Sequence, residues 1–501
     1  MKNNNLQWLV LATVIVGTFL GRLDQTIVNL ALPKIINDFG ITISSAGWIA
    51  TAYIIANAVF VPIWGKLGDT VGRKKVYIIG FVFFIISSVL AGLSWNFSSL
   101  IVFRVLQAIA SSADYPTAMA ILAVTFTDRK QRAQALGIWS SAFAASAVLG
   151  PLIGGPLIDL FNWRSIFLLN LPVGLIGLAM ALAFVNESVS DVKSYNFDWW
   201  GAVTLGGALA SLVLVLDKGT DWGWTSANSL ASYGAILISS AIFYYIERGH
   251  KDAIVDFKFF KNSAFTTALT NNFVVFMGMM GSVFLIPIFA QTFLGMTATE
   301  AGYLFIPMAV GFMVSAPLGG RLIGKVKPNI IIFVSTLGAA IGIFLFSILL
   351  DPRSGMWDIM IPLFIMAFSL GFAMAQRTSL ITNSVPTSEV GVASSILALA
   401  RNIAGAVGIA VSGTLVNNIS NSKILAIARN STINSFSSIN IKQAIGLMEL
   451  KAQVSAYATV FEVSAVIVFI GAIAALWIKA HPYVHAGEKD SELRDPIVVL
   501  D

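Results

Sequence analysis

The sequence predicts an all-α polytopic membrane protein, and three observations support this prediction. Of the 501 residues, 57% are hydrophobic and only 11% are charged, whereas a soluble domain has about 25% charged residues. The apolar residues form runs long enough to cross a bilayer core, which takes about 20 residues of helix. These runs are continuously apolar rather than alternating, so they predict helices and not barrel strands. This composition excludes a disordered chain and argues against a soluble enzyme.

Fourteen apolar runs are candidates for transmembrane helices. In order, they cover approximately residues 7–32, 46–65, 76–94, 99–125, 135–158, 165–185, 200–216, 230–246, 264–294, 301–320, 329–350, 358–383, 391–416 and 456–478. The first run is too long for a cleavable signal peptide and continues through Asn29 and Pro33. We therefore expect it to stay in the protein as the first membrane span.

Lysine and arginine are concentrated in alternate loops, which predicts the orientation. If the N-terminus is cytoplasmic, the cytoplasmic loops contain clusters such as Arg73–Lys75 and Arg129–Arg132. The short outer loops contain only isolated basic residues: Lys34, Arg164, Lys218 and Arg353. A long outer loop at 417–455 counts little toward this rule. The asymmetry predicts that both termini are cytoplasmic, and it explains the net charge of +6 without nucleic acid as a partner.

The chain also contains an internal repeat. Gly65 begins a glycine-rich basic loop after the second span, and Gly320 begins a similar loop after the tenth, an offset of 320 − 65 = 255 residues. Two six-helix halves around a central path are typical of transporters. We therefore predict an N-terminal half at 1–185, a linker with two extra helices at 186–262, a C-terminal half at 263–480 and a cytoplasmic tail at 481–501.

The residue inventory limits the possible chemistry. The chain has no cysteine, which excludes disulfides, zinc–thiolate sites and cysteine nucleophiles. Its histidines, His250, His481 and His485, lie in a loop and near the C-terminus. No nucleotide-binding Walker motif is present, which argues against an ATP-driven pump. We expect no catalytic residue, metal or cofactor.

The loop after the second span has the sequence Gly65-Lys-Leu-Gly-Asp-Thr-Val-Gly-Arg-Lys-Lys75. Its glycines permit a tight turn and a close approach of two helices. Asp69 can pair with Arg73 or with a neighbouring helix end, and such contacts can break and form again as two halves rock. The alternative is a plain basic turn that only sets topology. The pattern resembles the signature loop of the major facilitator superfamily, which implies a gating role for Gly65, Asp69, Gly72 and Arg73.

The fifth span contains the string Gly150-Pro-Leu-Ile-Gly-Gly-Pro156. Proline kinks a helix and glycine lets helices pack closely, so a generic packing kink is one interpretation. The ordered string is similar to the motif that marks antiporters of the same superfamily. That resemblance implies export against an incoming ion, with Gly150, Pro151, Gly154 and Gly155 as the motif residues.

Two further strings narrow the resemblance. They are Leu23-Asp-Gln-Thr-Ile-Val-Asn-Leu-Ala-Leu-Pro33 and Asn162-Trp-Arg-Ser-Ile-Phe-Leu-Leu-Asn-Leu-Pro-Val-Gly174. Both are similar to signatures of the fourteen-span drug:proton antiporter family, the EmrB/QacA type, and the inserted helix pair fits this branch. The resemblance implies a major facilitator fold and proton-coupled export of amphipathic or lipophilic compounds. It covers nearly the whole chain except 417–455 and the tail.

Charged residues inside the spans are costly, and they mark paths for ions or substrates. On the predicted helix 99–125, Arg104, Gln107, Ser111 and Asp114 fall within an arc of about 80°. Such a polar stripe predicts a water-accessible cavity. The segment from Arg104 to Gln107 also resembles a family motif linked with proton transfer. Asp24, Arg104 and Asp114 are therefore the predicted proton-coupling residues.

Depth in the membrane suggests how these charges pair. Asp24 lies about 24 Å along the first span, and Arg104 lies about 8 Å from the outer end of the fourth. These depths match, so we expect an ion pair between them. Asp114 lies about 15 Å deeper and has no obvious cation at its level. An isolated, partly desolvated carboxylate binds a proton readily. Asp114 is therefore either a proton carrier or a neutral packing residue, and both readings stay open.

The second half supplies candidates for a substrate cavity. Arg377 and Arg401 have no carboxylate in the nearby spans, and amide side chains are their expected polar partners. Arg401 could meet an anionic substrate, although a structural role is favoured. The predicted cavity residues are Gln107, Ser111, Asn271, Gln376 and Arg377.

The predicted function is multidrug efflux by alternating access in the plasma or inner membrane. We expect a monomer whose partners are an amphipathic small molecule, protons and the lipid bilayer. Alternatives are export of a native lipid or metabolite and, less favoured, a membrane receptor without transport. An intramembrane enzyme is the least favoured, because no catalytic histidine or metal cluster falls within a span.

Overall fold

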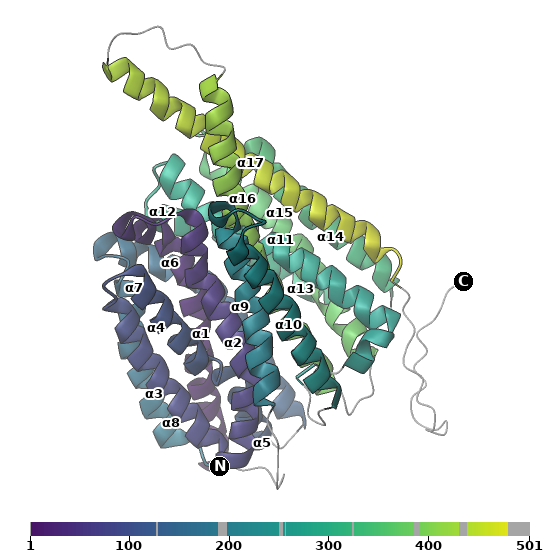
Figure 1. Cartoon of the computed structure of the whole chain (residues 1–501). Coiled ribbons are helices and arrows are strands. Elements are labelled where there is room, and N and C mark those ends of the chain that lie inside the picture. Colours follow the sequence, from purple (N-terminus) through teal and green to yellow (C-terminus); the bar gives the residue numbers. More distant parts are fainter. Residues whose placement is uncertain are drawn as a thin grey trace.

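A computed structural model describes residues 2–126, 129–188, 198–249, 254–255, 257–322, 325–384, 390–429 and 438–478. Throughout these ranges the regular structure is helical, with no strand (Figure 1). The helices are α1 (Lys2–Phe39), α2 (Ile43–Val71), α3 (Arg73–Gly92), α4 (Phe97–Ser111), α5 (Asp114–Thr125), α6 (Arg129–Leu160), α7 (Ser165–Leu168), α8 (Asn170–Phe184), α9 (Trp199–Trp222), α10 (Ala227–Gly249), the 3-10 helix η1 (Phe257–Lys261), α11 (Ser263–Phe293), α12 (Ala298–Tyr303), α13 (Ile306–Gly320), α14 (Pro328–Leu349), α15 (Met356–Asn383), α16 (Val390–Arg429) and α17 (Ser438–Ala475).

The fourteen predicted spans all correspond to helices. Within the described ranges, twelve segments are long and apolar enough to cross a membrane. The two other spans are the pair α4–α5 and helix α6, whose apolar part covers Leu149–Leu160. Each predicted span therefore has a helical counterpart, and the predicted all-α, multi-pass fold is confirmed. The predicted tail at 481–501 lies outside the described residues.

The predicted continuous helix at 99–125 is wrong in one respect, because it is interrupted between α4 and α5. Ser112 and Ala113 form a turn at the junction. Pro116 follows and has no backbone N–H for the carbonyl of Ser112, four residues earlier. The hydroxyl of Ser112 also donates to the carbonyl of Ile109 at 2.7 Å, which competes with regular helix bonds. Asp114 is consequently the first residue of a new helix.

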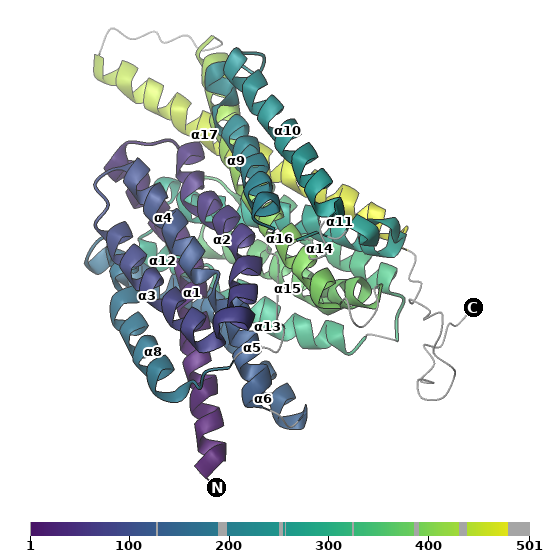
Figure 2. The same cartoon turned by 60° about the horizontal axis from the view of Figure 1, so that its bottom comes forward.

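The helices form two halves with the inserted pair beside them (Figures 1 and 2). Helices α1 to α8 form one half and α11 to α17 the other. Helix α9 contacts both α2 and α16, one helix of each half. An apolar cluster joins these elements through residues such as Ile55 of α2, Leu205 of α9 and Ile396 of α16. The inserted pair is therefore packed against both halves.

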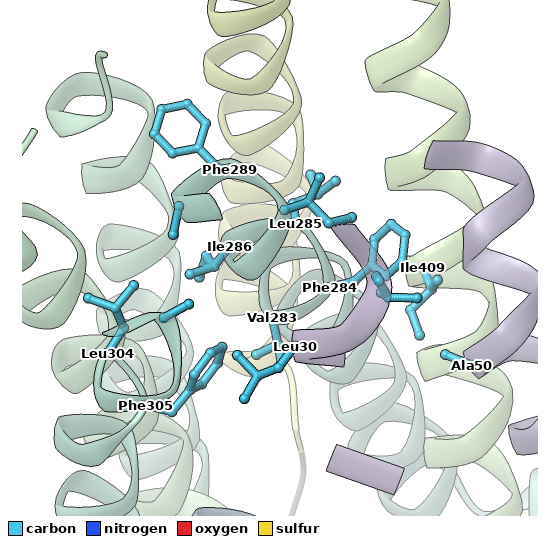
Figure 3. Packing of buried hydrophobic residues seen from close by; sticks show 14 of the residues in the cluster. Leu30, Ala50, Val283, Phe284, Leu285, Ile286, Phe289, Leu304, Phe305 and Ile409 are labelled. Carbon is cyan, nitrogen blue, oxygen red and sulfur yellow. The ribbon is translucent and has the colours of Figure 1, made fainter. Parts of the chain in front are cut away.

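We call the end of the bundle that carries the N-terminus the near end, and the opposite end the far end (Figure 1). Toward the far end, the two halves meet in one apolar cluster (Figure 3). Leu30 of α1 and Ala50 of α2 lie in this cluster with Phe284 of α11, Leu304 and Ile409 of α16. Close van der Waals packing of these side chains holds the halves together at this end.

The predicted loop at 417–455 is wrong over most of its length. Helix α16 continues to Arg429 and α17 begins at Ser438, and both project beyond the other helices at the far end (Figure 1). Lys423 of α16 donates to the hydroxyls of Ser455 at 2.5 Å and Thr459 at 2.9 Å on α17. Many residues in this segment are polar, so apolar runs alone underestimate the lengths of the two helices. Hydrogen bonds between the two helices extend them as a hairpin.

Candidate functional site

The expected ion pair between Asp24 and Arg104 is present in the N-terminal half. Arg104 Nη1 lies 2.5 Å from Asp24 Oδ2, and the two side chains are 1% and 0% exposed. The guanidinium also lies over the ring of Tyr53, with its carbon 4.1 Å from the ring centroid. A buried pair needs such additional partners, because desolvation of both charges opposes its formation.

Three neutral side chains complete the network around this pair. Gln107 and Asn170 each donate to Asp24 Oδ1 at 2.9 Å. Both also donate to the hydroxyl of Ser88, at 2.7 and 3.2 Å. Gln107 is fully buried here, within the N-terminal half. Its predicted place in a substrate cavity stays a prediction.

Asp114 occupies a different environment at the start of α5. Its Oδ2 accepts a hydrogen bond from Thr18 of α1 at 2.8 Å, while Oδ1 is buried without a hydrogen-bond partner. Among the described residues it forms no ion pair, although Arg22 acts on it electrostatically. Gly17 leaves the room for this arrangement, since a Cβ there would come within 2.8 Å of Asp114 Oδ1. Asp114 is therefore a half-buried carboxyl whose buried Oδ1 has spare acceptor capacity.

Ser111, at the end of α4, links this region to α2. Its hydroxyl lies 2.6 Å from the hydroxyl of Tyr53 and accepts from Asn57 at 3.2 Å. Tyr115, one residue after Asp114, is 44% exposed. The predicted polar stripe thus faces α1 and α2, and its members occupy three separate sets of hydrogen bonds, one with Asp24, one with Tyr53 and one with Thr18.

The glycine motif of α6 makes contacts in two directions. Gly150 and Gly154 lie against Thr26 and Ile27 of α1, where a Cβ would clash. Gly155 lies against α12, and a Cβ there would come within 2.5 Å of Thr299 Cα in the C-terminal half.

Further contacts between the halves surround this motif. Gly302 of α12 also permits close contact, since a Cβ there would come within 2.5 Å of the carbonyl oxygen of Pro151. Asp159 Oδ2 accepts from the backbone N–H and the hydroxyl of Thr299, at 2.8 and 2.7 Å. Gln291 donates to the carbonyl of Leu30 at 2.8 Å. The motif residues are therefore part of the seal between the halves at the far end.

The predicted gating loop joins α2 to α3 at Gly72, whose φ of +125° favours glycine. Glu187, just after α8, accepts from the backbone N–H groups of Lys74 at 3.0 Å and Lys75 at 3.2 Å. A carboxylate at a helix N-terminus is favourable because the first N–H groups have no partner within the helix. The side chain of Asp69 and the surroundings of Gly65 lie outside the described residues, and the roles of these residues and of Arg73 stay predictions.

The C-terminal half contains a related network without an acid. Arg377 of α15 donates to Asn271 Oδ1 of α11 at 2.9 Å and to the hydroxyl of Thr336 at 2.7 Å. In the order of helices within each half, α11 corresponds to α1 and α15 to α4–α5, so the two networks join corresponding helices, but Asn271 lies much nearer the start of α11 than Asp24 lies to the start of α1. Arg377 is 1% exposed and Gln376 is 2% exposed. Their predicted contact with a substrate stays a prediction, as does that of Asn271.

A family model described as Major Facilitator Superfamily matches residues 14–409, which is most of the chain. The chain belongs to the Major Facilitator Superfamily. It is thus a multi-pass member of a family of membrane transporters. The sequence resemblance to the EmrB/QacA type of drug:proton antiporter is also confirmed, since the similar proteins include members of that type.

Two of these relatives illustrate the similarity. A multidrug transporter protein MdtP of Bacillus subtilis is 33% identical over 412 residues, covering 82% of this chain and 75% of the relative. The probable multidrug resistance protein EmrY of Escherichia coli is 27% identical, covering 81% of this chain and 80% of the relative.

The fold of this major facilitator also resembles solved structures. A bacterial homologue of the human lysosomal transporter Spinster, solved in an inward-facing conformation, has a TM-score of 0.66 at 18% identity. It covers 95% of this chain and 99% of that chain. This similarity concerns the fold alone.

Sequence reasoning missed several members of these networks. Asn170 lies in the string 162–174 that joins the fifth and sixth spans. The only sequence feature that could have indicated its role is that it is a single amide within an apolar run. Ser88 offered no such signal, because single serines are common in membrane helices. Glu187 follows the sixth span by a few residues. Its contact with the start of α3 joins segments that are far apart in the sequence, so only the tertiary structure shows it.

Proposed function

We propose that this major facilitator is a proton-coupled antiporter that exports amphipathic or lipophilic compounds by alternating access. We place it as a monomer in the plasma or inner membrane with both termini in the cytoplasm, and it carries out transport without chemical change. The names of its relatives, which include multidrug transporters and an export protein, support this proposal. The observation that carries the coupling is Asp114, a half-buried carboxyl with one buried oxygen that lacks a hydrogen-bond partner.

Asp114 is a better candidate for the proton carrier than Asp24. Both oxygens of Asp24 already accept hydrogen bonds, and Arg104 balances its charge. Asp114 accepts from the hydroxyl of Thr18, lies beside the hydroxyl of Tyr77 and forms no ion pair among the described residues. A membrane potential of 100 mV supplies about 2.3 kcal/mol for each charge that crosses, which is enough to drive accumulation of a substrate. Neutralising Asp114 with a proton also removes the cost of a buried charge during the conformational change.

The closed far end supports the alternating-access part of the proposal. If the N-terminus is cytoplasmic, the seal between α6 and α12 closes the outer side of the transporter. Outward release of a substrate then requires these contacts to break, and inward opening requires them to form. Contacts through glycine and backbone bury little side chain, so two such arrangements can have similar free energies.

Proton coupling can be tested with Asp114→Asn in proteoliposomes loaded with a fluorescent lipophilic dye. An asparagine keeps the size and the bond to Thr18 but cannot carry a proton. We expect dye movement driven by an imposed pH gradient to fall at least about tenfold, while exchange of labelled for unlabelled dye without a gradient continues. Asp358→Asn, in the first turn of α15, is a matched control that keeps the wild-type rate. Normal gradient-driven transport by Asp114→Asn would show that another group carries the proton.

A second candidate function is export of a native acidic lipid or metabolite, with drugs as incidental substrates. Arg401 is partly buried in α16, where its guanidinium lies 5.1 Å from the ring centroid of Phe276. Neither Arg401 nor Arg377 forms an ion pair with a described carboxylate. An anionic group on an amphipathic substrate would balance this charge. Faster transport of anionic than cationic dyes of similar size, lost in Arg401→Gln, would favour this candidate.

A further inference from the structure

Two carboxyl groups meet at the near end of the inserted helix pair. Asp198 precedes α9 and Glu247 lies in the last turn of α10, and they are 4% and 3% exposed. Asp198 Oδ1 accepts from the backbone N–H of Gly201 at 2.6 Å, and Glu247 Oε2 accepts from that of Val255 at 3.1 Å. The other oxygen of each group, Asp198 Oδ2 and Glu247 Oε1, is buried with no donor.

These two remaining oxygens face each other. A Cβ on Gly201 would come closer than 3.0 Å to both of them, at 2.7 Å from Glu247 Oε1. Because the two oxygens lie 2.3 and 2.7 Å from the same point, they are at most 2.3 + 2.7 = 5.0 Å apart, and a proton on one of them allows a hydrogen bond between the two groups. Two ionised carboxylates cannot form such a bond, because neither carries a hydrogen. One of the two groups must therefore be protonated for the contact to be favourable.

The described cations near the two carboxyls do not pair with them. In the part of the chain that the structure describes, the basic residues closest in sequence to Glu247 and Val255 are Arg248 on α10 and Lys258 and Lys261 on η1. None of them forms an ion pair with either carboxyl in the described part of the chain. A group of three or more residues suited to hold a metal ion is also absent from the described residues. Two like charges in contact at a buried position repel strongly, which a single shared proton avoids.

We propose that Asp198 and Glu247 form a proton-binding site that holds one proton between two carboxyl groups, separate from Asp114. The site also ties down the segment that leads into the C-terminal half. Val255, the donor to Glu247, packs with Phe259 and Phe265 in the cluster that includes α9 and α10. Loss of the proton leaves two negative charges in contact, and their repulsion loosens this segment. Proton occupancy thus controls how firmly the inserted pair is attached to α11.

The proposal can be tested by infrared spectroscopy of the purified protein in lipid nanodiscs. Asp114→Asn serves as the background, so that a carboxyl band from Asp114 does not interfere. We expect the C=O band of a protonated carboxyl at neutral pH and its loss when Asp198→Asn and Glu247→Gln are added. The two amides can replace the shared hydrogen bond, so the fold is retained. An unchanged band in the substituted protein overturns the proposal, as does a wild-type band that disappears on addition of Na⁺ or Mg²⁺ at constant pH.

A second measurement examines the attached segment. Hydrogen exchange of a peptide covering 254–262, corrected for the intrinsic rate at each pH, should increase with pH in the wild type. It should be independent of pH in the Asp198→Asn, Glu247→Gln protein. Gly201→Ala should increase exchange at neutral pH by pushing the carboxyls apart. Gly207→Ala on the same helix, where the new Cβ meets only Ser239 Oγ at 3.5 Å, should leave it unchanged. Equal pH dependence in the wild-type and doubly substituted proteins overturns the proposal. Because no readout uses transport, a failure of the proposed export function leaves this test unaffected.

Discussion

At the scale of single residues, the ion pair of Asp24 and Arg104 shows how depth along a helix can predict a contact. Equal distances from the outer surface placed the two charges at one level, and the structure joins them. The same reasoning found no partner for Asp114, whose bond to Thr18 depends on the turn between α4 and α5. The ion pair was thus predictable, whereas the neutral members of the network, the donor Asn170 and the acceptor Ser88, were not. Amides and hydroxyls are tolerated at many positions, so their presence alone indicates no partner.

The energetic role of this pair leads to a prediction about stability. Asp24→Asn leaves the guanidinium of Arg104 buried without a balancing charge, so we expect a loss of about 3–5 kcal/mol. Adding Arg104→Gln should recover much of this loss, because both charges are then removed. Thermal unfolding in detergent would measure both effects. Asp38→Asn, which breaks the exposed pair with Arg164, is the control and should cost about 0–1 kcal/mol. Equal losses for the two aspartate substitutions would contradict the assignment.

At the scale of helices, the motif of α6 explains why three of its positions require glycine. Gly150 and Gly154 allow α1 to approach, and Gly155 allows the backbone of α12 to approach. The sequence string suggested close packing but did not reveal the partners. One partner, α12, belongs to the other half and lies more than a hundred residues further along the chain. Local sequence contains no record of such a distant neighbour.

This packing predicts the effect of a single methyl group. Gly155→Ala places a Cβ against the backbone of Thr299, so the far end should be forced open. The absence of native cysteines permits a direct measurement with Leu30→Cys as the reporter in the far-end cluster. We expect a membrane-impermeant thiol reagent to label it several-fold faster in Gly155→Ala than in the parent. Gly234→Ala on α10, which has open space around it, is the control. Equal labelling rates in all three proteins would show that Gly155 does not seal this end.

At the scale of the whole molecule, the contacts between the halves at the far end form a set that must break together. Asp159 and Gln291 contribute hydrogen bonds, and the apolar cluster around Leu30 contributes burial (Figure 3). The inserted pair adds a side connection, since α9 contacts one helix of each half. Movement of the halves therefore has to change the packing of α9 against α2 or α16.

A reversible covalent link would test the need for this movement. Asp159→Cys and Thr299→Cys place two thiols where a side chain now contacts a backbone across the halves. We expect an oxidant to form a disulfide in the resting protein and to reduce transport by at least about tenfold. A reducing agent should restore the rate, and Asp159→Cys alone should be insensitive to oxidation. Normal transport by the linked protein would argue against alternating access through the far end.

The sequence by itself determined the all-α multi-pass membrane fold and the family, as well as the pair of Asp24 and Arg104. These properties depend on apolar run length, on residue order and on rise per residue, which are all local quantities. The tertiary structure decided which end is closed, how far α16 and α17 extend, that Glu187 caps α3 and that Asp198 meets Glu247. In each of these cases the free energy comes from groups that are distant along the chain and that a membrane interior forces to find a partner. No local pattern specifies which partner that is.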